Sequence, residues 1–320
     1  MATSVFYEKY RPKDLESIVL PSRIKRLFET SEVTQNYLFY SGPPGAGKTT
    51  LCKILCQPYD SLEINISDES SVDTIRNKVK DFISTGSIVN GAYPDKIVFF
   101  DEIDGASDQF FKALRGVIEQ FEDNCKFIAT CNYITKVPDN IISRFFPVRF
   151  EPENEEEEKE ILKGYFKRLY AIIKKHDMEI EKDVLVSLIK RYFPDMRSML
   201  NIIQSLHISK VKEIQMSDIV KASYDNIDIF EFCVSKKNSV EAFKLFSKAY
   251  AGKTEDVLVS LGDNFIEWLL ESNKVKNVED KIGLIIREVA IHQVNTKFVI
   301  DPIVNMLSCI YAIQEIINNN

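Results

Sequence analysis

The chain has 320 residues, a formal net charge of −7, 45% hydrophobic residues and 28% charged residues. This length predicts two or three domains, and the composition is typical of a folded globular protein. No apolar run is long enough to span a membrane and no export signal begins the chain, so we expect a cytoplasmic protein without a membrane partner. The negative charge argues against a protein that coats nucleic acid through bulk positive charge.

The cysteines and histidines do not have the spacing of a zinc site. We expect the cysteines to be reduced core residues, as in most intracellular chains, and no metal site built from protein side chains alone. The residues considered are Cys52, Cys56, Cys125, Cys131, Cys233, Cys309, His176, His207 and His292.

Residues 37–150 alternate short apolar runs with amphipathic stretches. This pattern predicts an α/β fold in which helices cover a parallel sheet. The continuous apolar character of KIVFF suits a strand buried on both faces. The five predicted strands are Tyr37–Tyr40, Ser61–Ile66, Lys96–Phe100, Lys126–Cys131 and Phe145–Phe150.

A phosphate-binding loop follows the first of these strands. The stretch GPPGAGKT fits the pattern G-x-x-x-x-G-K-[ST] and precedes a helical stretch. Its glycines would let backbone amides turn toward phosphates, Lys48 would reach the β and γ phosphates of a nucleoside triphosphate, and the Thr49 hydroxyl would bind Mg²⁺. An ordinary glycine turn before a helix is the alternative. The expected nucleotide contacts here are Gly42, Pro43, Pro44, Gly45, Ala46, Gly47, Lys48, Thr49 and Thr50.

An acidic pair ends the strand KIVFF. Asp101 would lie beside the Mg²⁺, and Glu102 would orient and deprotonate the attacking water. Such a pair is commonly a solvated start of a loop, but here it follows a phosphate loop. We therefore predict that Thr49 and Asp101 hold Mg²⁺ and that Glu102 is the catalytic base.

Two further polar residues complete the predicted catalytic set around the sheet. Asn132 ends the strand FIATC, where its amide could hold the water or the γ phosphate; an ordinary turn-forming Asn is the alternative. Arg144 lies in a loop before the last strand and could stabilise the charge of the transferring phosphoryl group. Because this loop lies far from its own phosphate loop, Arg144 would act on the nucleotide of a neighbouring subunit; otherwise it is a surface arginine.

The sequence changes character at Glu151 and is helical from there onward. The acidic run EPENEEEEKEILKG predicts a helix start, because carboxylates favour the positive end of the helix dipole; an acidic interaction tail is the alternative. After a break at FPDM, Arg197 opens a helix from which it could reach the γ phosphate, or form a plain capping salt bridge. We predict three domains, 1–151, 152–227 and 228–320.

Together these motifs resemble those of the AAA+ ATPases, and most closely those of clamp-loader subunits. YEKYRPKDLESIV (residues 7–19) looks like the clamp-loader N-terminal box, in which the equivalents of Tyr10, Arg11 and Pro12 lie by the adenine. NISDESSVDTIRNKVKDF is similar to the signature helix of replication factor C small subunits, and KALRGVIE and ISRF match that family's Leu-Arg helix and finger. In its total length and in the divergence of its motifs from the family pattern, the chain looks more like a T-even-type phage clamp-loader large subunit than a cellular one. If a phage encodes it, the expected cytoplasm is that of the host.

The resemblance implies an AAA+ sheet domain, a helical lid domain and an all-α collar that joins subunits. It implies a pentameric spiral, with several copies of this chain and a distinct subunit, that binds ATP, opens a sliding clamp, grips primer–template DNA and hydrolyses ATP to release the closed clamp. The chain departs from the family at Ser70, where a basic residue is usual, at Phe111, where Gln is common, and at Phe145, where Cys is common.

The expected DNA contacts are basic residues on two helices. Arg76 and Lys80 are four residues apart and share a face opposite the apolar positions of their helix. Four or five subunits would supply roughly eight to ten phosphate contacts in this way. Lys112 and Arg115 are further candidates, although Arg115 could instead bridge subunits. A solvated basic face is the alternative.

The expected clamp contacts lie in the polar, glycine-punctuated segment STGSIVNGAYPDK, where Ile88, Val89 and Tyr93 are apolar. Apolar residues in such a segment suggest an interaction tip, and in clamp loaders this region inserts into a hydrophobic pocket of the clamp. Packing back onto the domain is the alternative.

Two other functions use the same ATP site. A translocating helicase or unfoldase needs pore loops, for which NGAYP is the only faint candidate. A non-hydrolysing scaffold would use ATP only to fasten an assembly, and it would have no need of Glu102, Asn132 or Arg144.

Overall fold

The computed structural model describes residues 5–30, 32–66, 72–84, 96–123, 125–223, 227–235, 246, 250, 253–272 and 274–318. The chain forms two compact units, the N-terminal unit of residues 1–215 and the C-terminal unit of residues 216–320. The N-terminal unit contains both the sheet and the helices that directly follow it, and the finer division into three domains stays a prediction. Within the described ranges, no helix is long and apolar enough to span a membrane.

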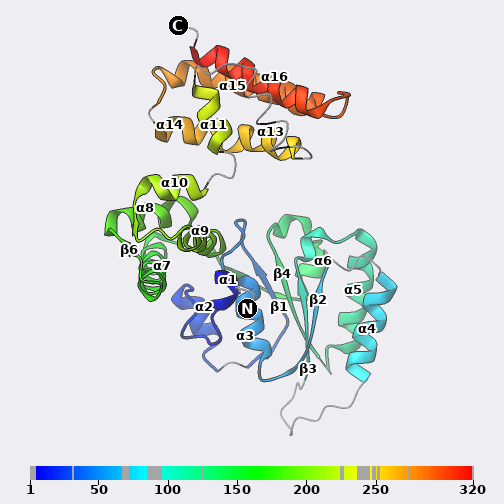
Figure 1. The fold of residues 1–320 in the computed structure, drawn as a ribbon. Coiled ribbons are helices and arrows are strands. Elements are labelled where there is room, and N and C mark those ends of the chain that lie inside the picture. The colour runs from blue at the N-terminus through cyan, green and yellow to red at the C-terminus, as the bar shows by residue number, and fades with distance from the viewer. Residues whose placement is uncertain are drawn as a thin grey trace. The chain divides into compact units, whose positions relative to one another are not determined.

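The N-terminal unit is built on a five-stranded parallel sheet with the strand order β2-β3-β4-β1-β5 (Figure 1). Leu38 of β1 pairs with Ala129 of β4 on one side and with Pro147 of β5 on the other. Each predicted strand is confirmed to within one residue at either end. The strands are β1 (Tyr37–Tyr40), β2 (Asp60–Asn65), β3 (Lys96–Asp101), β4 (Lys126–Cys131) and β5 (Phe146–Arg149).

Helices cover both faces of this sheet, as the continuous apolar strands predict. Val98 and Phe100 of β3 share an apolar cluster with helices α4 (Val72–Ser84) and α5 (Asp108–Phe121). Ile97 and Phe99 point to the other face and pack with helices α2 (Ser22–Leu27) and α3 (Lys48–Cys56). Two short helices, α1 (Phe6–Lys9) and α6 (Asp139–Ile142), and the turns η1 (Ile103–Gly105) and η2 (Ile134–Lys136) complete this layer arrangement.

A small helical subdomain follows β5 within the N-terminal unit, and we call it the lid. Its first helix begins as the acidic run predicts: the Asn154 side chain accepts hydrogen bonds from the amides of Glu156 and Glu157, at 3.1 and 3.0 Å. Four glutamates occupy the first turn, where the helix dipole favours them. The lid comprises α7 (Glu155–Lys175), α8 (Lys182–Tyr192), α9 (Met196–Ile208) and the paired short strands β6 (Glu179–Ile180) and β7 (Glu213–Ile214).

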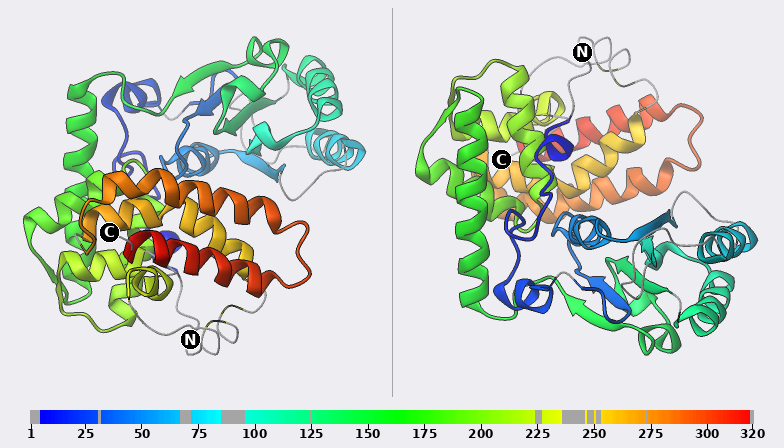
Figure 2. Two further views of the ribbon diagram at one scale, coloured as in Figure 1. Left: turned by 90° about the horizontal axis from the view of Figure 1, so that it is seen from above. Right: turned by 90° about the horizontal axis from the view of Figure 1, so that it is seen from below.

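The described part of the C-terminal unit is helical, as predicted for the last segment. Its core is apolar and centres on Trp268, Phe230 and Phe265, whose rings contact one another. The helices described in it are α10 (Met216–Ser223), α11 (Ile227–Val234), α13 (Thr254–Asp263), α14 (Phe265–Ser272), α15 (Val278–Asn295) and α16 (Pro302–Asn318). Figure 2 shows the long helices α15 and α16 lying alongside each other.

Candidate nucleotide site

The phosphate loop connects β1 to α3 and has two residues in backbone conformations that favour glycine. Gly45 and Gly47 have φ angles of 75° and 98°, a region that residues with a Cβ rarely adopt. Gly47 directly precedes the first residue of α3, Lys48. The loop therefore presents the N-terminal amides of a nine-residue helix, where an anion is stabilised by free N–H groups and by the helix dipole.

Lys48 is buried beneath this loop and joins it to the end of β4. Its Nζ donates to the Ser41 hydroxyl at 2.7 Å and to Asn132 Oδ1 at 2.8 Å. Burial lowers the pKa of Lys48, because an ammonium group removed from water is less stable. The structure thus brings two predicted site residues, Lys48 and Asn132, into direct contact.

Thr49 and Asp101 lie together at the end of β3. The Thr49 hydroxyl donates to Asp101 Oδ1 and Oδ2, at 3.0 and 3.2 Å. The Thr130 hydroxyl also donates to Asp101 and accepts from the Glu102 amide at 2.9 Å. A hydroxyl and a carboxylate side by side are hard oxygen ligands of the kind that Mg²⁺ prefers, so the residues present fit the predicted metal.

Glu102 follows Asp101 in a left-handed conformation with φ 59°. A non-glycine residue at positive φ is strained, and such strain clusters at functional sites. This conformation turns the chain away from the strand direction immediately after β3, and Glu102 lines the same cavity as Lys48, Asp101 and Asn132.

That cavity lies between the phosphate loop, the N-terminal segment and the lid. Of the predicted nucleotide contacts, it includes those from Pro44 to Thr50 and also Tyr10, Arg11 and Pro12. Arg11 donates to the Thr50 hydroxyl at 3.3 Å. The sequence motifs do not indicate the remaining lining residues, which are Tyr7, Ile18, Val19, Thr130, Cys131, Tyr165, Arg168, Met196 and Leu200.

Gly42 is held by a residue that follows β5. Its amide donates to Glu151 Oε1 at 2.7 Å, and neither Gly42 nor Pro43 lines the cavity. The expected contacts of Gly42 and Pro43 with the nucleotide therefore stay predictions. The hydrogen bond with the Gly42 amide and the ion pair with Arg149 lower the pKa of Glu151 despite its partial burial.

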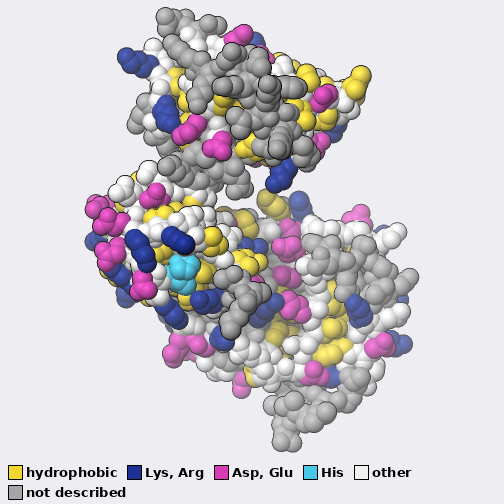
Figure 3. All heavy atoms as spheres, viewed as in Figure 1, with side chains coloured by type: hydrophobic (Ala, Val, Ile, Leu, Met, Phe, Trp, Pro, Cys, Tyr) yellow, Lys and Arg dark blue, Asp and Glu magenta, His cyan; other side chains and the backbone are white. Residues whose placement is uncertain are grey.

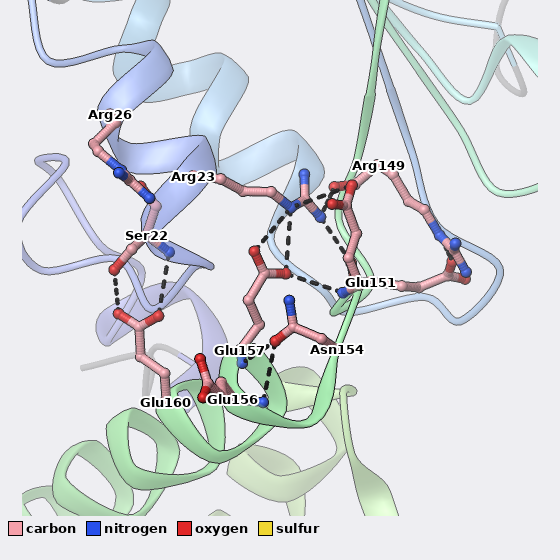
Figure 4. A network of polar contacts seen from close by, with 10 residues as sticks. Ser22, Arg23, Arg26, Arg149, Glu151, Asn154, Glu156, Glu157 and Glu160 are labelled. Carbon is pink, nitrogen blue, oxygen red and sulfur yellow. Dashed lines mark hydrogen bonds and ion pairs between the residues drawn. The ribbon is translucent and has the colours of Figure 1, made fainter.

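Figure 4 shows the polar network around Glu151, which ties the sheet to the lid. Arg23 on α2 donates to the carbonyl oxygens of Arg149 and Glu151, at 2.7 and 2.8 Å, and forms an ion pair with Glu157 on α7. The Ser22 hydroxyl donates to Glu160, one turn further along α7. The connection from β5 into the lid is thus held at several points by α2.

Arg197 lies where the sequence predicts it, in the first turn of α9 and at the cavity. The capping interaction is made by Asp195, whose carboxylate accepts from the backbone amides of Arg197 and Ser198 at 3.0 and 3.1 Å. The Arg197 guanidinium instead lies over the Tyr7 ring, 5.5 Å from its centroid. Its side chain is therefore placed at the cavity and is separate from the cap.

Arg144 lies outside this cavity. It donates to the Asn140 carbonyl oxygen and to the Glu119 carboxylate, which also accepts from Arg115 Nε at 3.0 Å. The Arg115 hydrogen bond, followed by that of Arg144, lowers the pKa of Glu119. The structure therefore separates Arg144 from the other predicted catalytic residues of its own chain.

The predicted DNA contacts are exposed. Arg76 and Lys80 lie on α4, and Lys112 and Arg115 on α5. Phe111 is buried in the apolar cluster between the sheet and these helices. The predicted clamp contacts Ile88, Val89 and Tyr93, and the departure at Ser70, lie outside the described residues.

Two of the histidines that lie far apart in the sequence meet in space. The His176 and His207 ring centroids are 4.4 Å apart, and His176 Nε2 is 2.7 Å from the Tyr10 hydroxyl. Burial, followed by His207, lowers the pKa of His176. All six cysteines are buried free thiols, and no cluster of three metal-binding side chains occurs in the part of the chain that the structure describes.

Comparison with known proteins agrees with this geometry. Residues 38–152 match the ATPase family associated with various cellular activities (AAA). The chain is 30% identical to a replication factor C small subunit of Archaeoglobus fulgidus over 87% of this chain and 89% of the relative, and 31% identical to one of Methanococcus vannielii over 96% and 92%. The chain belongs to the replication factor C small-subunit family.

Membership of this family of AAA+ ATPases makes the chain an ATPase of the clamp-loader type. Among solved structures, a mutant of RuvB from Thermotoga maritima superposes with a TM-score of 0.51 at 17% identity, covering 82% of this chain and 91% of that chain. That similarity supports the AAA+ fold of a parallel sheet followed by helices.

Proposed function

We propose that this chain loads a sliding clamp as one of several ATPase subunits in a spiral. In this proposal, ATP binding builds a spiral that opens a ring-shaped clamp and grips primer–template DNA, and hydrolysis releases the closed clamp. The family relationship and the position of Arg144 outside the nucleotide cavity of its own chain both support it. The partner subunits would include further copies of this chain and a distinct subunit.

The observation that supports the proposal most strongly is the position of Arg144. Glu102, Asn132 and Arg197 line the cavity of their own chain, whereas Arg144 lies on the surface outside it. A guanidinium that stabilises the transferring phosphoryl group is worth several orders of magnitude in rate. If Arg144 supplies it to a neighbouring subunit, fast hydrolysis requires a correctly assembled spiral.

The residues of one chain would then divide the chemistry as follows. Thr49 and Asp101 would hold Mg²⁺, which supplies charge neutralisation at the phosphates when bound. Lys48 would pair with the phosphates, Asn132 would hold the water or the γ phosphate, and Glu102 would take the proton of the attacking water. The hydrogen bond between Lys48 and Asn132 supports this assignment, because it holds the end of β4 beside the group that would bind the phosphates.

Assembly would use the C-terminal unit as a collar. It exposes many large apolar side chains, including Phe298 at 80% exposure between α15 and α16. Figure 3 shows hydrophobic side chains gathered at the end of this unit where α15 leads into α16. An apolar surface of this extent is expected where subunits pack. The exposed residues are Val259, Leu270, Leu284, Ile286, Ile291, Val294, Phe298, Ile300 and Val304.

DNA binding would depend on repetition, since each chain carries a net charge of −7. Exposed Arg76 and Lys80 in four or five subunits would give roughly eight to ten phosphate contacts, enough for strong, salt-dependent binding. Contacts with the backbone alone carry no sequence information, which suits an enzyme that must act at any primer.

The test is ATP turnover by the purified chain, with and without its partner subunits, primer–template DNA and the cognate clamp. We expect low turnover by the isolated monomer and strong stimulation when all components are present. Full turnover by a verified monomer would contradict the shared site. Stimulation by long single strands alone would indicate a translocase, and absent turnover with every component would indicate a scaffold.

A further inference from the structure

The N-terminal segment, residues 5–20, connects the phosphate-loop helix with the lid. On one side, Ile18 and Leu20 pack in the apolar cluster of α3, and Gln57 of the turn after α3 donates to the Lys13 carbonyl oxygen at 3.0 Å. On the other side, the Phe6 amide donates to Gln204 on α9 at 2.8 Å. Figure 1 and the right view of Figure 2 show this dark blue segment beside the lid helices.

Arg168 on α7 holds this segment at two points. Its Nη1 donates to the Ser17 carbonyl oxygen at 2.6 Å, and its Nη2 donates to the Tyr10 carbonyl oxygen. These two carbonyls bracket residues 10–17, the turn that includes Tyr10, Arg11 and Pro12. A guanidinium is suited to this task, because its planar fork can donate in two directions at once from a fixed geometry.

Gly164 brings α7 close enough for this contact. It lies one turn before Arg168, and a Cβ at this position would lie 2.5 Å from Val19 Cγ1. Val19 is β-branched and its side chain has little rotational freedom to move away. A glycine in the middle of a 21-residue helix is otherwise unfavourable, so close approach to the N-terminal segment is a physical reason for it.

We propose that Arg168 is a positioning residue for the nucleotide base: it fixes the turn of residues 10–17 on lid helix α7, so that base recognition and lid position are coupled. The inference rests on the proposed ATPase function and on the expectation, implied by the family resemblance, that the adenine lies beside Tyr10, Arg11 and Pro12, which line the same cavity as the phosphate loop. It does not depend on the clamp, the DNA or the partner subunits, because it concerns nucleotide binding by one chain.

The test compares ligands that share the triphosphate and differ in the base. The full-length chain is titrated calorimetrically with ATP and GTP, and inorganic tripolyphosphate is measured by competition against ATP, all with Mg²⁺. For Arg168→Ala and Arg168→Lys we expect the Kd for ATP to rise roughly 10-fold while the Kd for tripolyphosphate stays within about twofold, because charge-assisted hydrogen bonds to the base-side turn are lost and the phosphate loop is unchanged. Lys167→Ala, an exposed neighbour on the same helix, should leave all three values unchanged.

Several outcomes would overturn the proposal. An equal loss of affinity for tripolyphosphate would mean that Arg168 acts on the phosphates, and an ATP affinity within about twofold of wild type would mean that it has no role in binding. Full rescue by Arg168→Lys would show that charge alone suffices. A wild-type chain that binds ATP and tripolyphosphate equally well would remove the assigned base site, while leaving the clamp-loading proposal to its own assay.

A second pair of variants tests the same contact without touching the arginine. Gly164→Ala should weaken ATP binding and leave tripolyphosphate binding unchanged. The double variant Gly164→Ala with Val19→Ala should recover most of the lost ATP affinity, so that it binds ATP nearly as well as Val19→Ala alone. Gly283→Ala is the matched control, since an added Cβ there meets no atom within 4 Å. Failure of the double variant to recover would contradict the proposed contact between α7 and the segment.

Discussion

Replacing Gly45 with alanine tests whether the lid rests on the phosphate loop. Gly45 and Gly47 both have positive φ angles, 75° and 98°, so alanine is strained at either position. The two differ in their surroundings. A Cβ on Gly45 would lie 2.9 Å from the Cα of Asp195 in the lid, whereas a Cβ on Gly47 would lie 3.5 Å from the end of the Ile18 side chain, an ordinary contact.

The expected magnitudes follow from this difference. Alanine in a left-handed conformation costs about 1–2 kcal/mol, which applies to both variants. Overpacking against atoms that cannot rotate away costs about 1–3 kcal/mol more, which applies to Gly45→Ala alone because the Asp195 Cα belongs to the backbone. We therefore expect Gly45→Ala to reduce the free energy of unfolding of the N-terminal unit by about 1–3 kcal/mol more than Gly47→Ala does.

Urea unfolding without nucleotide measures this difference. The only tryptophan of the chain, Trp268, is buried in the C-terminal unit, so its fluorescence follows that unit, and far-UV circular dichroism follows both. The Trp268 transition serves as the internal control and should not move. Equal losses for the two glycine variants would refute the reasoning, because the lid would then make no close contact with Gly45.

Four further variants test the site. Lys48→Ala should raise the Kd for ATP at least about 100-fold in a titration, because it removes the buried ammonium of the phosphate loop. Glu102→Gln should keep ATP binding and lower turnover roughly 10²–10⁴-fold, stalling the assembly on DNA; robust turnover would remove the assigned base. Arg144→Ala should leave ATP affinity of the isolated chain within about twofold but lower turnover of the assembly roughly 10³-fold or more and poison mixed assemblies; normal activity would contradict the shared site. Arg76→Ala with Lys80→Ala should weaken DNA binding and reduce its salt dependence, by a slope of about 0.9 per lost phosphate contact, while sparing basal turnover; an unchanged slope would leave these residues as a solvated face.

Local sequence was sufficient to predict the sheet and to single out residues that the structure brings together around one cavity. Each strand is a short apolar run because both faces of the sheet are buried, and β1 and β4 match their predicted ranges at both ends. Asp101 and Asn132 could be placed near one another because the carboxyl ends of parallel strands lie at one edge of a sheet. The contact of Lys48 with Asn132 is consistent with that placement.

The residues on the lid side of the site could not be predicted from local sequence. Tyr165 and Arg168 belong to an amphipathic helix, in which a residue that lines a cavity has the same spacing as one that faces the core. The Gly42 amide binds the carboxylate of Glu151, a residue 109 positions away, so no local pattern indicates it. Contacts of this kind depend on how the lid folds back over the phosphate loop.

The positions of three arginines indicate the order of ATP binding and ATP hydrolysis in the proposed cycle. Arg168 and Arg197 line the cavity of their own chain, so a single chain already has the guanidinium groups that would position the base-side turn and reach the γ phosphate. Arg144 is held outside by Glu119 and the Asn140 carbonyl oxygen. Binding would therefore need one subunit, whereas fast hydrolysis would need two in register. In the proposed cycle, a chain with this division would retain ATP until a neighbour docks, and the release of energy would depend on the completed spiral.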